Sequence, residues 1–135
     1  MLSDLYFQFW GERSDLILMH TQFDMMQKEG KYIILVCENE EKIIGSVMGI
    51  ICQDLYATCL PFMVVENMIV DERVRRQGIG SSLLKKLEDE AHYYNCSQMI
   101  LVTEKERTDA CAFYETNGFS RNMTGYKKQI KCRFR

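Results

Sequence analysis

The 135-residue sequence lacks several features that define other classes of protein. No apolar run approaches the roughly 20 residues that a membrane-spanning helix needs. The first residues lack a basic patch followed by an apolar stretch, so they show no secretion signal. The six cysteines form no C-x-x-C pair, and their scattered positions among apolar neighbours are typical of buried thiols kept reduced in the cytosol. We therefore expect a cytoplasmic protein without a membrane partner.

The sequence also lacks an excess of positive charge, because its formal net charge is −2. Basic residues gather only in a turn at residues 73–76 and in the last nine residues, so a nucleic-acid partner is not expected. His20 and His92 have no partner at metal-ligand spacing, and no metal site is expected. Without repeats, linkers or low-complexity segments, residues 1–135 are predicted to form a single domain that can bury its own core.

The hydrophobic patterns that are present predict an α/β domain with helices packed on a mixed sheet of about six strands. Short helices are expected at residues 3–10 and 107–116, and a longer one from residue 15 to Gly30, whose stripe of Leu16, Met19, Phe23 and Met26 should face the core. Strands are expected at 32–38, 43–52, 62–70 and 98–103, with an alternating strand after residue 126. The unit from 62 to 103 should be a right-handed parallel crossover.

Two glycines in the second strand, Gly45 and Gly49, indicate a bulge or a close neighbouring backbone. The most informative stretch follows the third strand. Residues 66–90 (ENMIVDERVRRQGIGSSLLKKLEDE) read as a strand end, a turn with three arginines and two glycines, and an amphipathic helix. Glycines let the backbone adopt positive φ and approach a ligand closely, and a helix N-terminus attracts phosphate. A Walker A loop is absent, and Leu83 stands where a Rossmann fingerprint needs its third glycine.

This turn resembles the acyl-coenzyme A binding motif of the GNAT superfamily of N-acetyltransferases, Arg/Gln-x-x-Gly-x-Gly/Ala, through Arg75, Gly78 and Gly80. A second segment, ACAFYETNGF at residues 110–119, resembles the family's A-x-x-F-Y-E-x-x-G-F. The resemblance covers residues 32–135 well and the N-terminal third loosely. It implies a mostly antiparallel sheet, splayed at the coenzyme site, and an acyltransferase that uses acetyl-coenzyme A.

The resemblance also implies roles for individual residues. Backbone amides from Arg76 to Ser81 would hold the pyrophosphate of coenzyme A, and the strand end at Met68 to Val70 would pair with its pantetheine amides. Arg107 stands where the family often has an asparagine that contacts pantetheine, and it either reaches the coenzyme's phosphates or points to solvent. The cofactor-binding residues expected in this way are Met68, Ile69, Val70, Arg75, Arg76, Gln77, Gly78, Ile79, Gly80, Ser81 and Arg107.

Tyr114 corresponds to the family's tyrosine near the thioester sulfur, which protonates the leaving thiolate. With an unperturbed pKa of about 10, a tyrosine is protonated at pH 7 and can donate. The alternative is a helix residue that only covers the sheet. Glu66 is the candidate base: in a regular strand it would share a face with Val64, Met68 and Val70, and such apolar surroundings would suit it to accept a proton. Alternatively, Glu66 only orients the substrate.

The resemblance implies that the acceptor is a primary amine, which attacks directly in a ternary complex. A thiol nucleophile is not supported, because Cys111 has no histidine placed to activate it. Acidic residues (Glu12, Asp54) and aromatic residues (Tyr6, Trp10, Tyr56) are candidates for the acceptor site. A non-catalytic acyl-coenzyme A sensor or regulatory module is the alternative function. A typical family member begins with a strand, for which the first ten residues leave little room, and an exposed sheet edge would suit a homodimer.

Overall fold

The strand, turn and helix expected between residues 62 and 93 are present in the computed structural model, as β3 (Phe62–Val70), the 3-10 helix η1 (Glu72–Val74) and α3 (Ile79–Tyr93). The structure describes residues 1–131. These fall into two compact units, Met1–Leu101 and a second that begins at Val102. A single domain over residues 1–135 stays a prediction.

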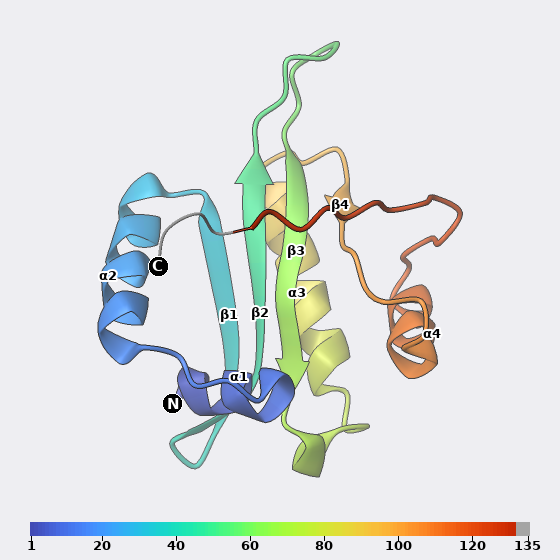
Figure 1. The fold of residues 1–135 in the computed structure, drawn as a ribbon. Helices are drawn as coiled ribbons and strands as arrows, with labels where there is room; N and C mark the ends of the chain where they lie inside the picture. The colour runs from blue at the N-terminus through green and yellow to red at the C-terminus, as the bar shows by residue number, and fades with distance from the viewer. Residues whose placement is uncertain (132–135) are drawn as a thin grey trace. The chain divides into compact units, whose positions relative to one another are not determined.

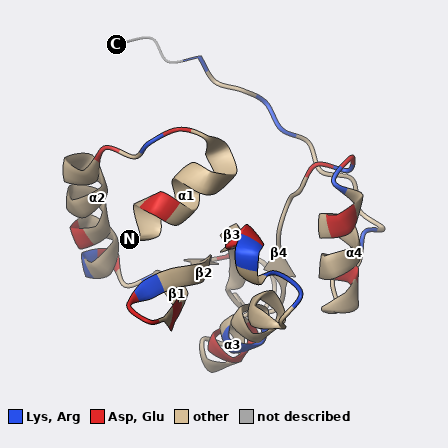
Figure 2. Ribbon diagram, turned by 90° about the horizontal axis from the view of Figure 1, so that it is seen from below, with Lys and Arg blue, Asp and Glu red and all other residues tan. Residues whose placement is uncertain are grey.

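The first unit is a sheet with helices on both faces. Its other elements are α1 (Leu2–Trp10), α2 (Leu16–Glu29), β1 (Tyr32–Asn39), β2 (Lys42–Cys52) and β4 (Met99–Ile100). The strand order is β1-β2-β3-β4, with antiparallel pairing at the first two junctions and parallel pairing between β3 and β4. Figure 1 shows α1 crossing the front of the strands and α3 lying behind them, and the turned view in Figure 2 places these helices on opposite sides. The predicted mixed, mostly antiparallel sheet and its parallel crossover are confirmed.

Helix α3 packs directly against the backbone of β2. Its residues Leu83, Leu84, Leu87 and Ala91 are buried, as the apolar stripe predicted. A Cβ atom built on Gly45 would lie 2.9 Å from Ile79 Cγ2, and one built on Gly49 would lie 2.8 Å from Leu87 Cδ1. Both glycines therefore leave room for neighbouring side chains, those of α3 and, at Gly49, also Met63. The predicted close neighbour was a backbone, and the atoms that approach within 3.0 Å belong to side chains.

A bulge interrupts β3 beside the candidate site. Ser46 pairs with Ile69, but Met48 pairs with Glu66, so two steps along β2 match three along β3. Asn67, inside the bulge, has a φ of 54°, which a residue with a side chain seldom adopts.

The extra residue reverses which side chains share a face of the sheet. Glu66 pairs with Met48 and Ile69 pairs with Ser46, two residues along β2, so Glu66 and Ile69 lie on the same face. Val70 pairs with Gly45, where a side chain would point at α3, so Val70 lies on the opposite face. The expectation that Glu66 shares a face with Val70 is therefore wrong, since it assumed a regular strand.

The sheet has four strands among the described residues, so the expectation of about six is wrong. The strand expected at 98–103 is reduced to the two residues Met99 and Ile100. Residues 126–131 form no strand, and the remainder of that expected strand lies outside the described residues. Alternation makes a strand only where a neighbouring strand accepts its hydrogen bonds, and Tyr126 is 94% exposed.

Helix α2 was expected to bury its apolar stripe, and this expectation is wrong. None of its residues is buried, and Leu16 and Phe23 are 47% and 44% exposed. The helix lies beside β1, the edge strand, so little of the sheet is available to cover it (Figure 1). Asp15 caps the helix by accepting hydrogen bonds from the N–H groups of Ile17 and Leu18, both at 3.0 Å.

In the second unit the predicted short helix is α4 (Thr108–Thr116), ended by Asn117 and by Gly118 with a φ of 90°. Five of the six cysteines are described, and all five are free thiols. Within residues 1–131, no helix combines the length and apolar character needed to cross a bilayer.

Candidate functional site

One edge of β3 is open along most of its length. Among the described residues, β4 pairs with β3 only at Met63 and Val64, so no strand lies beside residues 65–70 on that side. An edge of this kind offers backbone N–H and C=O groups to an extended ligand that carries its own amides. The predicted contact segment, Met68 to Val70, lies at the end of this open edge.

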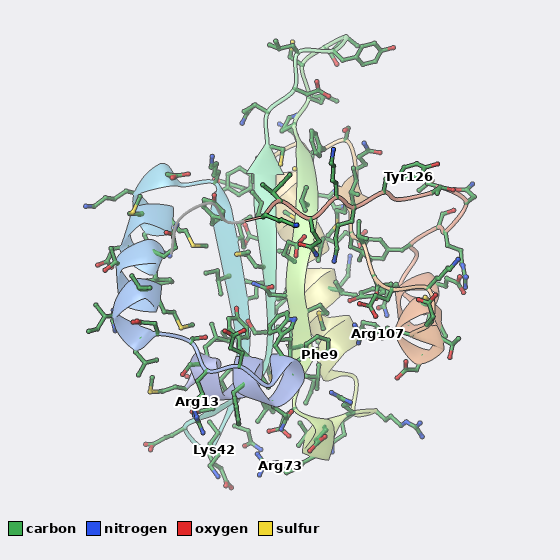
Figure 3. All side chains as sticks on the ribbon, in the orientation of Figure 1. Phe9, Arg13, Lys42, Arg73, Arg107 and Tyr126 are labelled. Carbon is green, nitrogen blue, oxygen red and sulfur yellow. The ribbon has the colours of Figure 1, made fainter. Side chains whose placement is uncertain are left out.

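Asp71 holds the chain as it leaves the sheet. Its N–H donates to the Ile44 carbonyl at 2.8 Å. Its carboxylate is buried and accepts three hydrogen bonds from Arg73: from the backbone N–H at 3.0 Å, Nε at 3.1 Å and Nη2 at 2.8 Å. These bonds hold the pKa of Asp71 well below its usual range. Figure 3 shows Arg73 at η1, beside the end of β3.

Two residues of the turn between η1 and α3 have left-handed backbone. Arg76 has a φ of 64° and Gly78 a φ of 81°, whereas Arg75 before them is extended, with a φ of −65° and a ψ of 161°. A turn of this kind can present backbone N–H groups to an anion. Arg75 also donates from Nε to the Val70 carbonyl at 3.1 Å, so part of its guanidinium group closes the turn.

The N-terminus of α3 completes the arrangement. Gly78 is its N-cap residue, and no side chain caps the helix by a hydrogen bond. A Cβ atom built on Gly78 meets nothing within 4 Å, and the side chains of Arg76 and Gln77 are exposed. The first turn of a helix carries N–H groups without intrahelical partners and a partial positive charge. The expected residues 75–81 thus come together in a turn that fits a phosphate group, and Figure 2 shows the basic residues between η1 and α3.

Glu66 lies on the other face of the sheet, toward α1, and its side chain is exposed. The expectation of apolar surroundings is therefore wrong. Near it, α1 places Tyr6 over Ser46 and Asn67. Burial raises the pKa of Tyr6, and the side chains of Asn67 and Ser46 act in the opposite direction. The Ser46 hydroxyl is buried close to Tyr6 without reaching hydrogen-bond geometry.

Gln8 on α1 is a residue that the sequence patterns did not single out. Its side-chain oxygen accepts from the Glu72 N–H at 3.1 Å, and its side-chain nitrogen lies 3.5 Å from Asp71 Oδ1. Nothing local in the sequence connects residue 8 with a loop more than 60 positions away. Asp71 did carry a signal, because an aspartate just before a turn often caps it.

Tyr114 and Arg107 belong to the second unit. Tyr114 is half-buried on α4, with its ring centroid 5.3 Å from Phe113 and 5.9 Å from Phe119. Arg107 is the N-cap residue of α4, and its N–H donates to the Glu104 carbonyl at 3.0 Å. Within residues 1–131, no group of three potential metal ligands comes together.

Comparisons with known proteins agree on one family. The model of the Acetyltransferase (GNAT) family matches residues 1–119. Human N-acetyltransferase 8 is 29% identical over 115 residues, which cover 83% of this chain and 50% of that protein. The chain spans between 45% and 66% of the length of the curated relatives it matches.

Solved structures show the same fold. A protein of Agrobacterium tumefaciens str. C58, whose name assigns it to the acetyltransferases, has a TM-score of 0.89 and 24% identity, covering 96% of this chain and 91% of its own. AAC(6')-Iy, solved with the bisubstrate analogue CoA-S-monomethyl-acetylneamine, has a TM-score of 0.79 and 18% identity, covering 97% and 90%.

Proposed function

The chain belongs to the GNAT acetyltransferase family, and from this premise we propose that it moves an acetyl group from acetyl-coenzyme A to a primary amine. The observation that carries the proposal is the turn from Arg75 to Ser81, where two residues with left-handed backbone lead into a helix N-terminus that no side chain caps. The open edge of β3 leads directly into it. A phosphate-bearing ligand with a chain of amides matches both features.

Each part of the site has a separate task in this proposal. The amides of residues 76–81 hold the pyrophosphate, and Met68 to Val70 pair with the pantetheine amides. Acetyl-coenzyme A supplies the activated acetyl thioester. Tyr114 protonates the leaving thiolate, a role supported by its place in the family motif. The acceptor attacks the thioester directly as the neutral amine, after its ammonium form has lost a proton to solvent water, and no acyl-enzyme forms on Cys111.

Glu66 is proposed to orient the acceptor's ammonium group. Its carboxylate is exposed on the face of the sheet that carries α1, where a cationic amine can reach it from solvent. Human N-acetyltransferase 8 and glucosamine-6-phosphate N-acetyltransferase from Arabidopsis thaliana are both named for N-acetylation, and a small amine such as an amino sugar is one acceptor of the right chemistry.

Calorimetric titration with acetyl-coenzyme A, followed by thiol release over a panel of amines, tests the proposal. We expect binding at a single site and thiol release that depends on one class of amine. Replacing Tyr114 by Phe should lower turnover roughly 10²–10⁴-fold without changing coenzyme affinity, because the general acid is lost and the turn is not. Binding without turnover over the whole panel would favour the sensor function, and absence of binding would exclude both.

A further inference from the structure

Helix α1 is held to the sheet by few contacts. It has nine residues, and Leu5 alone is fully buried. A helix of this length is marginal without tertiary support. Leu5 and Tyr6, whose ring lies over Ser46 and Asn67, anchor a single turn of the helix, so a second contact further along decides the direction of the helix across the sheet.

Gln8 supplies that second contact, one turn after Leu5 on the same side of the helix. Its oxygen accepts from the Glu72 N–H at 3.1 Å, and its nitrogen lies 3.5 Å from Asp71 Oδ1. Glu72 begins η1, so its N–H is one of the donors that a helix start leaves unpaired. Asp71 is itself fixed by Arg73 and by the Ile44 carbonyl, so Gln8 contacts a rigid part of the loop.

The chemistry of this contact suits an amide. Gln8 accepts from a backbone N–H and places its nitrogen 3.5 Å from a carboxylate oxygen, and a neutral amide can serve both partners. Glutamate has the same shape but no donor, and it would set a second negative charge against Asp71. Asparagine keeps the amide but is one methylene shorter.

We propose that Gln8 is a positioning residue that latches α1 to the loop leading into the coenzyme-binding turn, so that α1 and the turn move as one. The inference rests on the proposed function for the identity of the ligand. Its consequence concerns the aromatic side chains of α1, among which the Tyr6 and Trp10 rings meet edge to face at 5.4 Å. Through the latch, a coenzyme held at the turn should also hold α1, and with it these rings, more tightly.

Hydrogen–deuterium exchange of the full chain, with and without saturating coenzyme A, tests the latch. In the wild type, coenzyme A should slow exchange both in residues 71–82 and in α1. In Gln8→Glu, coenzyme A should still slow exchange in residues 71–82 but no longer in α1. The Kd for coenzyme A should rise roughly three- to tenfold, the range expected for one lost hydrogen bond. Gln8→Asn should behave in the same way. Gln22→Glu, the same charge change at an exposed position of α2, should match the wild type.

The latch would be overturned if coenzyme A did not slow exchange in α1 of the wild type, or if it still slowed exchange in α1 of Gln8→Glu. Either result would leave the coenzyme site intact. If coenzyme A slows exchange nowhere, the proposed function fails instead. The latch is then judged on the ligand-free protein, where Gln8→Glu must speed exchange in both α1 and residues 71–74. Faster exchange in α1 alone would overturn it.

Discussion

A single carboxylate, that of Asp71, fixes the start of the turn, and its protonation should be visible in the stability of the protein. Because the folded pKa of Asp71 lies below its ordinary value, its stabilising effect is complete above about pH 5 and is lost as the pH falls below about 4. We expect Asp71→Asn to lower the free energy of unfolding by about 2 kcal/mol at pH 7, the scale of hydrogen bonds to a charged group.

Urea denaturation of both proteins at pH 7 and pH 3 measures this effect. The difference between wild type and Asp71→Asn should shrink at the lower pH, since Asp71 takes up a proton there in the unfolded chain while the folded carboxylate keeps its charge. A difference that is equal at both values would mean that the Arg73 pair contributes nothing that depends on ionisation.

Gly78 combines a positive φ with open space, which allows a matched test of the anion site. Asparagine tolerates this conformation better than other residues with a side chain, and aspartate has the same size with a negative charge. We expect Gly78→Asn and Gly78→Asp to fold with similar stability, but only Gly78→Asp to lose coenzyme A binding more than tenfold relative to Gly78→Asn. Titration calorimetry on both variants measures this, and equal affinities would show that no anion sits at the N-terminus of α3.

Residue-level prediction from the sequence succeeded where the reason was local. Gly78 and its neighbours could be located because a left-handed turn before a helix has a distinct composition. The surroundings of Glu66 were predicted wrongly, since the bulge at Asn67 reverses the alternation and leaves no clear mark in the sequence. Gln8 was missed because its partners are defined only by the tertiary fold.

At the scale of elements, the contact between β2 and α3 depends on the absence of a side chain at Gly49. An added Cβ atom would lie 2.8 Å from both Leu87 Cδ1 and Met63 Sδ, and both of these residues are completely buried. We expect Gly49→Ala to destabilise the protein by about 1–3 kcal/mol, because neither neighbour has space to move into. Gly125→Ala is the control: its Cβ atom would meet Val102 only at 3.9 Å, and its stability should match the wild type. Equal stability of the two variants in urea would show that α3 can shift away from β2.

The order and direction of β1 to β3 could be predicted from hydrophobic runs and turn residues, because consecutive strands usually pair. The burial of α2 and the last strand could not. Both depend on whether another surface covers an apolar stripe. Periodicity shows that a segment has such a stripe, but it does not show what packs against it. Helix α2 has the pattern of a core helix but lies beside the edge strand, with Ile17 80% exposed.

For the whole molecule, the family could be predicted from two short motifs in the right order, because each is tied to a backbone geometry that few folds supply. The number of strands was overestimated. The segment after residue 126 was counted as a strand because its residues alternate, but it pairs with no strand among the described residues. The acceptor was not predictable at any scale, because exposed acidic and aromatic residues do not specify one amine.

The whole molecule should become more stable when coenzyme A binds, because a ligand that binds only the folded state shifts unfolding by mass action. At a ligand concentration 100 times its Kd, one site adds about 2.7 kcal/mol to the free energy of unfolding, and each further tenfold increase adds about 1.4 kcal/mol. The Tm should therefore keep rising with the logarithm of coenzyme concentration and show no plateau at saturation. Thermal unfolding followed by circular dichroism measures it, with Gly78→Asp as the variant that should show no rise. A wild-type Tm that is flat up to millimolar coenzyme A would contradict a coenzyme site at this turn, and the acetyltransferase proposal would fail with it.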